Sequence, residues 1–280
     1  MLRLTSAIAG YSLMALMSGC VPTPAAESSL NVQPLPVALG ESSALSCEHG
    51  SLWSLNDSGN KAEVFQLSFS AQLQRQQALK LTNRDWEALA WAGDVLWLAD
   101  VGNNDGSRSE LQLYGLNRQL KPEQRIRIRM PESSSLPYQH DVDFESLVYW
   151  QQQLWLVSKS WKSLTARFYP INSSAPEQSL PQPRYEVTLP FLVTDASAVP
   201  GTDQLVLVGY APPQQRFWQM IQGKFEVWMA LLDGEGKLIK QQQLPVDTQV
   251  EGACVDPAGQ LWLSSEVGYK PASLYRLLHW

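Results

Sequence analysis

The stretch DWEALAWAGDVLWLAD, residues 85–100, returns 58 positions later as DFESLVYWQQQLWLVS, residues 143–158. In both copies Asp-aromatic-Glu precedes a small residue and Leu, and Leu-Trp-Leu begins nine residues after the Glu. Alternating large and small side chains, a short reversal and a second apolar segment are typical of two antiparallel β-strands. A single hairpin cannot bury both of its faces, so the recurrence predicts a repeat protein in which each unit is completed by its neighbour.

Three further copies of this pattern are present. VEGACVDPAGQLWLSSE (250–266) keeps the Glu, SALSCEHGSLWSLND (43–57) has Ser in its place, and DASAVPGTDQLVLVGY (195–210) is a weaker copy in which Val206 stands eleven residues after the acid. The copies begin at Ser43, Glu87, Glu145, Asp195 and Glu251. Their spacings of 44 to 58 residues are each long enough for four short strands. The sequence therefore predicts an all-β protein, a β-propeller of five four-stranded blades over residues 41–280, with six blades as the alternative.

Composition and charge agree with a folded, turn-rich chain. Of the 280 residues, 44% are hydrophobic and 17% are charged, and the chain contains 18 Pro and 17 Gly. The formal net charge of −6 offers no surplus of basic residues to hold a phosphate backbone. Nucleic acid is therefore excluded as the expected partner.

The first twenty residues, MLRLTSAIAGYSLMALMSGC, read as an export signal. Arg3 supplies the positive charge, residues 8–17 form an apolar run too short to span a bilayer stably, and Ser-Gly precedes Cys20. The ending resembles a bacterial lipobox, which implies a signal peptide over 1–19, lipidation of Cys20 and, from Val21, anchoring at the outer membrane, facing the periplasm. A plain cleaved signal is the alternative. Residues 20–40, which are rich in Pro, are expected to form a tether between the lipid and the domain.

Four tryptophans occupy the centre of the second strand of their copies, namely Trp53, Trp97, Trp155 and Trp262. We expect them to pack between neighbouring blades, with ligand stacking as the other interpretation.

The acids that head four copies, Glu87, Glu145, Asp195 and Glu251, are expected on the innermost strands, near one mouth of the central channel. Carboxylates held close together must bind a cation, accept several hydrogen bonds or raise their pKa values. Two interpretations follow. The acids bind a divalent cation such as Ca²⁺ or another positively charged ligand, or each acid accepts backbone N–H groups from the next blade and locks the ring.

A second polar set follows the Leu-Trp-Leu strands, at loops where propellers place binding residues. The candidates on this rim are Asn56, Asp57, Asp100, Asn103, Lys159 and Glu266. Asn and Gly in such loops also support turns without binding anything. For Lys159 an ion pair with a ring carboxylate is favoured over the binding of an anion.

Cys47 and Cys254 lie in the first and last copies, which a closed ring places side by side. Cys47 is four residues after Ser43 and Cys254 is three after Glu251, so the two side chains point to opposite faces of their blades, as contact between neighbouring blades requires. A disulfide here would clasp the ring in an exported protein. Two buried free thiols are the alternative.

The strand starts EAL (87–89), ESL (145–147) and EGA (251–253), with LWLADVGNN (96–104) and LWLSSE (261–266), resemble bacterial propellers related to the esterase-like phytase family and, more distantly, to the gluconolactonase type. The resemblance implies a divalent metal held by an inner-strand Glu with Asn and Asp from other blades, where it activates water or a lactone. In this sequence the Glu matches Glu87, Glu145 or Glu251, and the companions match Asn103 or Asn56, and Asp100. Those families usually have six blades, whereas this sequence contains five copies.

Two function classes stay open. The first, which we favour, is an envelope-anchored module that binds an unidentified protein or small molecule through the channel mouth and the rim loops. The second is a metal-dependent hydrolase of an ester, lactone or phosphoester. The sequence contains no Gly-x-Ser-x-Gly, no His-Glu-x-x-His and no phosphate-binding loop, so no catalytic motif supports the second class.

Overall fold

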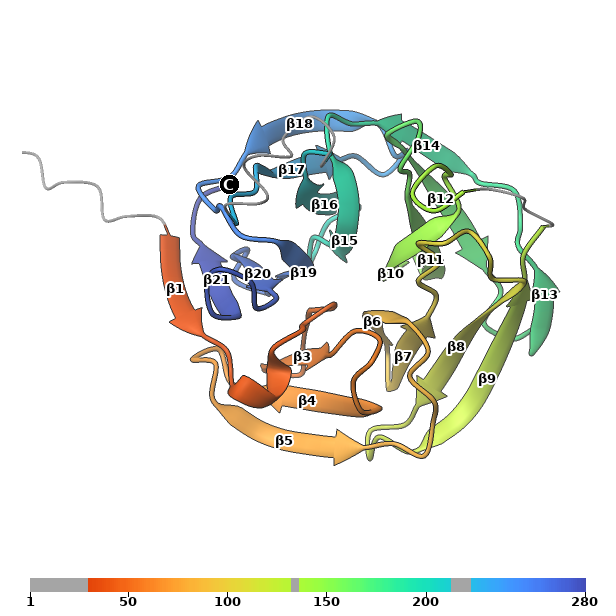
Figure 1. Ribbon diagram of the computed structural model, residues 1–280, viewed down its shortest axis with the longest axis horizontal. Coiled ribbons are helices and arrows are strands. Elements are labelled where there is room, and N and C mark those ends of the chain that lie inside the picture. The colour runs from red at the N-terminus through yellow and green to blue at the C-terminus, as the bar shows by residue number, and fades with distance from the viewer. Residues whose placement is uncertain (1–29, 132–135, 213–222) are drawn as a thin grey trace, which may run out of the picture.

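The computed structural model describes residues 30–131, 136–212 and 223–280, which form five antiparallel sheets arranged around a central axis (Figure 1). Each sheet is one blade, and in four of the five blades the strand nearest the axis comes first along the chain. The predicted five-bladed β-propeller is confirmed. Residues 1–29, which include the predicted signal peptide and Cys20, lie outside the described residues.

The blades follow the chain order. Blade 1 consists of β2 (Ser46–Glu48), β3 (Ser51–Leu55), β4 (Glu63–Leu67) and β5 (Leu73–Ala78). Blade 2 consists of β6 (Trp86–Ala92), β7 (Val95–Asp100), β8 (Glu110–Leu116) and β9 (Pro122–Arg129), with β13 (Glu177–Ser179) added in parallel at its outer edge. Blade 3 consists of β10 (Asp143–Trp150), β11 (Gln153–Lys159), β12 (Thr165–Ile171) and β14 (Tyr185–Thr188). Blade 4 consists of β15 (Leu192–Ala198), β16 (Leu205–Tyr210), β17 (Val227–Leu232) and β18 (Leu238–Gln243).

Blade 5 joins the two ends of the described chain. It consists of β19 (Val250–Val255), β20 (Leu261–Ser265), β21 (Ser273–Leu277) and, as its outermost strand, β1 (Leu30–Pro34). The prediction of a tether over residues 20–40 is therefore wrong for residues 30–40, because β1 pairs with β21 and the 3₁₀ turn η1 (Val37–Leu39) buries Leu39. Pro34 can stand at the end of an edge strand, where its missing N–H breaks no ladder. The propeller therefore includes residues 30–40 as well as the predicted residues 41–280.

The apolar core lies between the blades. The buried apolar residues of the described chain form five clusters, and each cluster draws its members from two neighbouring blades. Trp53, Trp97, Trp155 and Trp262 belong to four of these clusters, and Val206 takes the equivalent place in the fifth. The predicted packing role of the tryptophans is confirmed.

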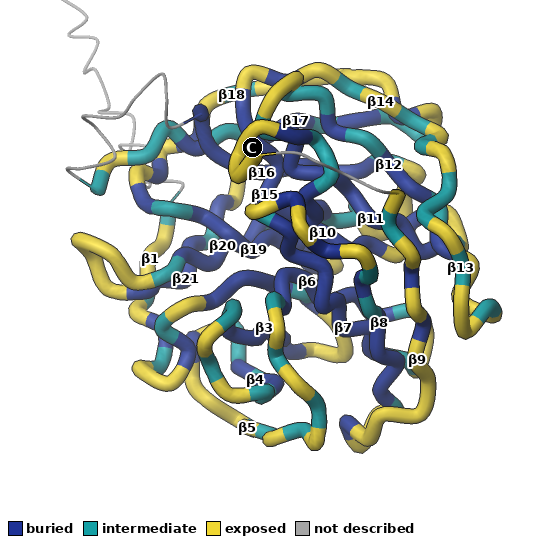
Figure 2. The backbone as a smooth tube through the Cα atoms, turned by 45° about the vertical axis from the view of Figure 1, so that its right-hand side comes forward, coloured by how far each residue is buried: buried dark blue, intermediate teal, exposed yellow. Residues whose placement is uncertain are grey.

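Burial falls from the axis outwards, as Figure 2 shows. All residues of β19 and β20 are buried, whereas β5 and β18 at the edges of their blades are largely exposed. Within the described residues, no helix has the length and apolar character needed to cross a membrane.

A disulfide joins the first blade to the last. Cys47 on β2 and Cys254 on β19 are bonded, with their Cα atoms 5.5 Å apart and 207 residues apart in the sequence. The predicted disulfide is confirmed. Together with the pairing of β1 and β21, it closes the ring on both its inner and its outer side.

Candidate functional site

Four of the five innermost strands carry one extra residue each, a β-bulge, at the end that forms one mouth of the channel. On β6, β10 and β19 the extra residues are Glu87, Glu145 and Glu251, since the ladder skips them. A bulge bends its strand and re-aims a side chain away from the sheet face. The bulges therefore turn three carboxylates into the channel.

The fourth copy differs, because its bulge residue is Thr194 and not Asp195. In the four blades with a bulge, the residue three positions after the bulge pairs with the centre of the second strand, as Ala90 does with Trp97 and Ser197 with Val206. The hairpin of the fourth copy is longer, so counting back from Val206 led to the wrong residue.

Asp195 lies on the innermost strand, as predicted, but it does not line the channel mouth. Its carboxylate is 2% exposed and accepts backbone N–H groups from Ala196 (2.8 Å) and from Ala253 of the next blade (2.7 Å). Thr194 also reaches the next blade, where its hydroxyl donates to the carbonyl oxygen of Val250 (2.8 Å). At this position the structure supports the interpretation that the acid accepts N–H groups from the next blade and locks the two blades together.

The three bulge glutamates open onto a cavity of about 210 Å³ at the channel mouth. Its described lining comprises Ser43, Asp57, Glu87, Asn104, Tyr138, Glu145, Lys159, Trp161, Tyr210, Gln249, Glu251 and Glu266. Five of these residues are acidic, and Lys159 is the single basic residue among them. The cavity therefore has a strong excess of negative charge.

Lys159 forms the predicted ion pair with a ring carboxylate. Its ammonium group lies 3.1 Å from Glu145 and also faces the rings of Trp161 and Tyr210. Both partners of the ion pair are buried, and the surrounding carboxylates raise the pKa of Lys159 well above its usual range. One lysine thus offsets one of the five acids.

Burial and neighbouring acids raise the pKa values of other acids in the cavity. Burial, followed by the charges of Glu251 and Asp57, raises the pKa of Glu266 to about 8. Burial also raises the pKa of Glu87 well above its ordinary value, with the charge of Glu145 as the next cause. Carboxyl groups with such raised pKa values are characteristic of functional sites.

Glu251 has an oxygen without a protein partner. Its Oε1 accepts hydrogen bonds from Gln249 (2.7 Å) and Tyr210 (3.4 Å), whereas Oε2 is buried and has no hydrogen-bond partner within the part of the chain that the structure describes. A buried acceptor without a donor is costly, so an atom in this state marks a place for a ligand.

A second acidic group lies beside Glu87. Carboxylate oxygens of Asp57, Asp85 and Glu87 all lie within 4.8 Å of one another. Asp57 follows β3, whereas Asp85 and Glu87 belong to the segment that begins blade 2. Burial and the charges of Asp57 and Asp143 raise the pKa of Asp85 to about 6.

The rim candidates divide into two groups. Asp57, Lys159 and Glu266 line the cavity, as expected of binding residues. The other three candidates, Asn56, Asp100 and Asn103, instead contact other groups of the protein.

The second group makes contacts within the protein. Asn56 accepts from the backbone of Glu41 (3.2 Å) and donates to Ala38 (2.8 Å), while Asp100 forms a buried ion pair with Arg108 (2.8 Å). Asn103 donates to the carbonyl oxygen of Val142 (3.0 Å). These are turn-supporting roles, so the three companions that the resemblance assigned to a metal do not join the glutamates.

The residues of the site that the sequence analysis did not single out include Asp85 and Tyr210. Asp85 belongs to the repeated Asp-aromatic-Glu, so the repeat itself was a signal that could have identified it. Tyr210 carries no such signal, since its side chain reaches the cavity only because β16 ends there.

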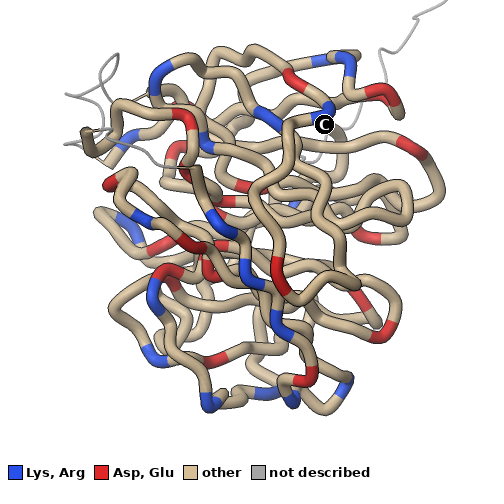
Figure 3. The backbone as a smooth tube through the Cα atoms, turned by 90° about the vertical axis from the view of Figure 1, so that its right-hand side faces the viewer, with Lys and Arg blue, Asp and Glu red and all other residues tan. Residues whose placement is uncertain are grey.

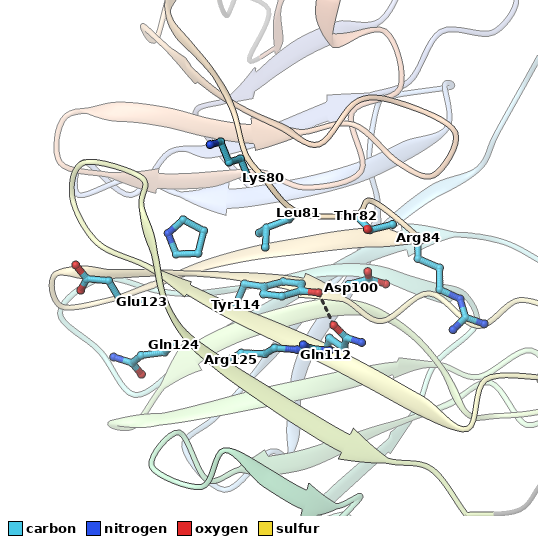
Figure 4. Close-up of a pocket in the computed structure, with 11 residues that line it drawn as sticks. Lys80, Leu81, Thr82, Arg84, Asp100, Gln112, Tyr114, Glu123, Gln124 and Arg125 are labelled. Carbon is cyan, nitrogen blue, oxygen red and sulfur yellow. Dashed lines mark hydrogen bonds between the residues drawn. The ribbon is translucent and has the colours of Figure 1, made fainter.

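A larger cavity than the one at the channel mouth lies elsewhere, in a groove of about 700 Å³ on the outside of blades 1 and 2 (Figure 4). The segment between β5 and β6 forms one wall, with Lys80 and Arg84, and the outer strands of blade 2 form the other, with Tyr114 and Arg125. Figure 3 views the side of β9 and shows basic positions following one another along a strand. The groove is open and its basic side chains Lys80, Arg84 and Arg125 are exposed, so it is far less buried than the channel mouth.

No family model matches this chain, and no curated protein matches it in sequence. Solved structures resemble it in fold at very low identity. A hypothetical protein from Leishmania major is 11% identical over 89% of this chain and 90% of its own, with a TM-score of 0.52. A protein of unknown function from Bacteroides caccae is 10% identical over 82% and 72% (TM-score 0.48), and a virginiamycin B lyase from Staphylococcus aureus is 12% identical over 88% and 68% (TM-score 0.43). These likenesses concern the fold alone, and the resemblance to phytase-like and gluconolactonase-type propellers stays a prediction.

Proposed function

We propose that this propeller is a binding module that holds a positively charged ligand in the acidic mouth of its channel. The observation that carries the proposal is the charge of the cavity, in which Lys159 is the only described basic residue among five acids. Acids that served only to lock the blades would be paired with donors, as Asp195 is. Tyr138 and Trp161, which pack edge to face at 4.9 Å, add aromatic surface that favours a cation.

The proposal is tested by neutralising Glu251 without any ligand. In Glu251→Gln the retained oxygen still accepts from Gln249 and Tyr210, while the new amide can donate to neighbouring acids. A site that retains repelling charges for binding gains stability when one is removed, here about 1 kcal/mol in the free energy of unfolding. The matched variant is Asp195→Asn, which disturbs a carboxylate fully used by the protein and should lose about 2 kcal/mol. Equal losses in urea unfolding of both variants would mean that Glu251 is structural and would refute the proposal.

The proposed location is the outer membrane, with the protein anchored by a lipid on Cys20 and facing the periplasm. The disulfide supports an exported protein, since such bonds persist in oxidising compartments. Fractionation of cells that express the wild type or Cys20→Ser tests the anchor. The wild type should sediment with outer membranes, and the variant should not. Equal sedimentation would exclude the anchor.

A second candidate, a metal-dependent hydrolase, keeps one observation in its favour. The carboxyl groups of Asp85 and Glu266 have pKa values of about 6 and about 8, near the range that acid–base catalysis requires. Hydrolysis of p-nitrophenyl acetate and p-nitrophenyl phosphate, with and without Ca²⁺, tests this candidate. If Glu266→Gln hydrolyses these substrates at the wild-type rate, Glu266 has no role in acid–base catalysis.

A further inference from the structure

We infer that the cavity at the channel mouth (the acidic cavity) and a second cavity beside it together bind an organic amine, with its ammonium group at Glu251 and its apolar substituent against Tyr269. The inference rests on the proposed function and names the class of positively charged ligand that the mouth holds. A metal ion has no apolar part and would leave the second cavity without an occupant.

The second cavity adjoins the acidic cavity and has a different wall. It has a volume of about 240 Å³ and shares Gln249 and Glu266 with the acidic cavity of about 210 Å³. Its described lining also includes Phe225, Val267 and Tyr269, so its wall is mainly apolar, whereas the wall of the acidic cavity is mainly polar. Pockets for small organic ligands usually have volumes of about 300–1,000 Å³. Neither cavity alone reaches this range, whereas the two together do.

Packed side chains connect the two cavities. The ring of Tyr210, which lines the acidic cavity, packs edge to face against the ring of Phe225, which lines the second, with the ring centroids 5.2 Å apart. Gln249 lines both cavities, and its amide donates to Oε1 of Glu251 (2.7 Å). One ligand can therefore contact the acids with one end and the apolar wall with the other.

Glu251 supplies the sign of a ligand at the polar end. It lines the acidic cavity and is 7% exposed, and its buried Oε2 has no hydrogen-bond partner among the residues that the structure describes. An ammonium group has N–H donors for this oxygen and a positive charge that offsets the charge of the acid. A ligand without a donor would leave Oε2 as costly as before.

The protein already holds one ammonium group in the acidic cavity. Nζ of Lys159 lies 3.1 Å from Glu145, and it lies 4.9 Å and 5.4 Å from the ring centroids of Trp161 and Tyr210. A carboxylate together with aromatic rings is thus an environment that suits an alkylammonium ion. Because Lys159 pairs with Glu145, it does not supply the donor that Oε2 of Glu251 lacks.

The loop between β20 and β21 presents apolar side chains to the second cavity. Val267 and Tyr269 line this cavity, although they are 53% and 73% exposed. The loop is held in place, because the N–H of Val267 donates to the carbonyl oxygen of Gly40 (2.6 Å) and Lys270 forms an ion pair with Asp247 (2.5 Å). An alkyl chain that covers these side chains would remove apolar surface from water, which favours binding.

The experiment measures the binding of hexylamine to purified full-length protein by calorimetry, in a buffer that contains EDTA, with the same buffer without protein as the blank. The wild type should bind one equivalent with a dissociation constant on the order of millimolar, as expected for a ligand of this size. Ethylamine should bind at least about tenfold more weakly, because it buries four fewer methylene groups. 1-Hexanol, which lacks the charge, should show no saturable binding.

Two variants address the two ends of the ligand. Glu251→Gln should weaken the binding of both amines about tenfold or more, because it removes the charge at the ammonium end. Tyr269→Ala should weaken hexylamine binding about five- to tenfold and leave ethylamine binding unchanged, because it shortens the apolar wall alone. The control is Tyr149→Ala, an exposed aromatic residue at the other mouth of the channel, whose affinity for hexylamine should stay within about twofold of the wild type.

Circular dichroism and urea unfolding of each variant separate lost binding from lost folding. The side chain of Tyr269 is largely exposed, so Tyr269→Ala should fold and its affinity decides if Glu251→Gln does not fold. The amine site is overturned if the wild type shows no saturable binding of hexylamine, if hexylamine and ethylamine bind equally, or if Tyr269→Ala keeps the wild-type affinity for hexylamine. If Glu251→Gln is still stabilised without any ligand in that case, the proposed function stands with another positively charged ligand.

Discussion

The two mouths of the channel are built from opposite ends of the same inner strands, and they differ in almost every property. At one mouth the bulges present Glu87, Glu145 and Glu251 to a cavity with excess negative charge. At the other, a cavity of about 160 Å³ is lined by mainly small and apolar residues and by the disulfide between Cys47 and Cys254. Along each inner strand, the contacts that stabilise the fold lie at one end and the acids of the proposed binding site lie at the other. Cross-links and apolar contacts at one end allow repelling charges at the other.

The largest expected effect comes from the mouth of the channel that carries the disulfide. Replacing both cysteines with Ala removes a cross-link that spans 207 residues, which the chain-entropy account values at about 4 to 5 kcal/mol. The free energy of unfolding in urea should fall by that amount while the acidic mouth keeps its affinity for cations. A loss of cation affinity on the same scale would show that the two mouths are not independent.

A smaller loss is expected within the acidic mouth. Glu145→Gln leaves the buried ammonium of Lys159 without its ion-pair partner, which should cost about 3 kcal/mol. The opposite sign is expected for Glu251→Gln, so the two variants sharpen the distinction between a paired and an unpaired acid. Urea unfolding of both in the same buffer provides the measurement, and the same sign for both would remove the distinction.

The last expected effect concerns pH. Because the pKa of Glu266 is raised from 4.5 to about 8, the folded protein binds a proton that the unfolded chain has lost between these values. Stability should therefore fall as the pH rises from about 4.5 to about 8, and it should change little from this group outside that window. Glu251, Asp57 and Glu41 raise this pKa and Lys159 opposes them. Glu266→Gln should flatten the slope, and an unchanged slope would place the titration in another group.

Much of the fold followed from local pattern. Five copies of one hairpin predicted five blades, and the places of Cys47 and Cys254 in the first and last copies predicted their bond. The position of Glu87, Glu145 and Glu251 on the inner strands was also readable, because each glutamate stands at a nearly constant distance from a tryptophan. Such features depend on strand alternation and repeat spacing, which the sequence records directly.

Other features depended on partners that lie far away in the chain. β1 was not recognised as a strand, because its exposed residues carry little apolar pattern and its partner β21 lies some 240 residues later. Asp195 was aligned one residue out of phase, because hairpin length varies between copies and only the ladder defines the bulge.

The sequence alone thus determined the ring, its closure by the disulfide and the strands that carry the acids. Only the tertiary structure decided which groups each acid contacts. Asp85 and Asp143 occupy the same repeat position, yet Asp143 accepts two hydrogen bonds from Asn103 and Trp161 while Asp85 faces Asp57 and Glu87. The physical reason is that a hydrogen bond or a repulsion acts over a few ångströms in space, whereas the repeat records only distance along the chain.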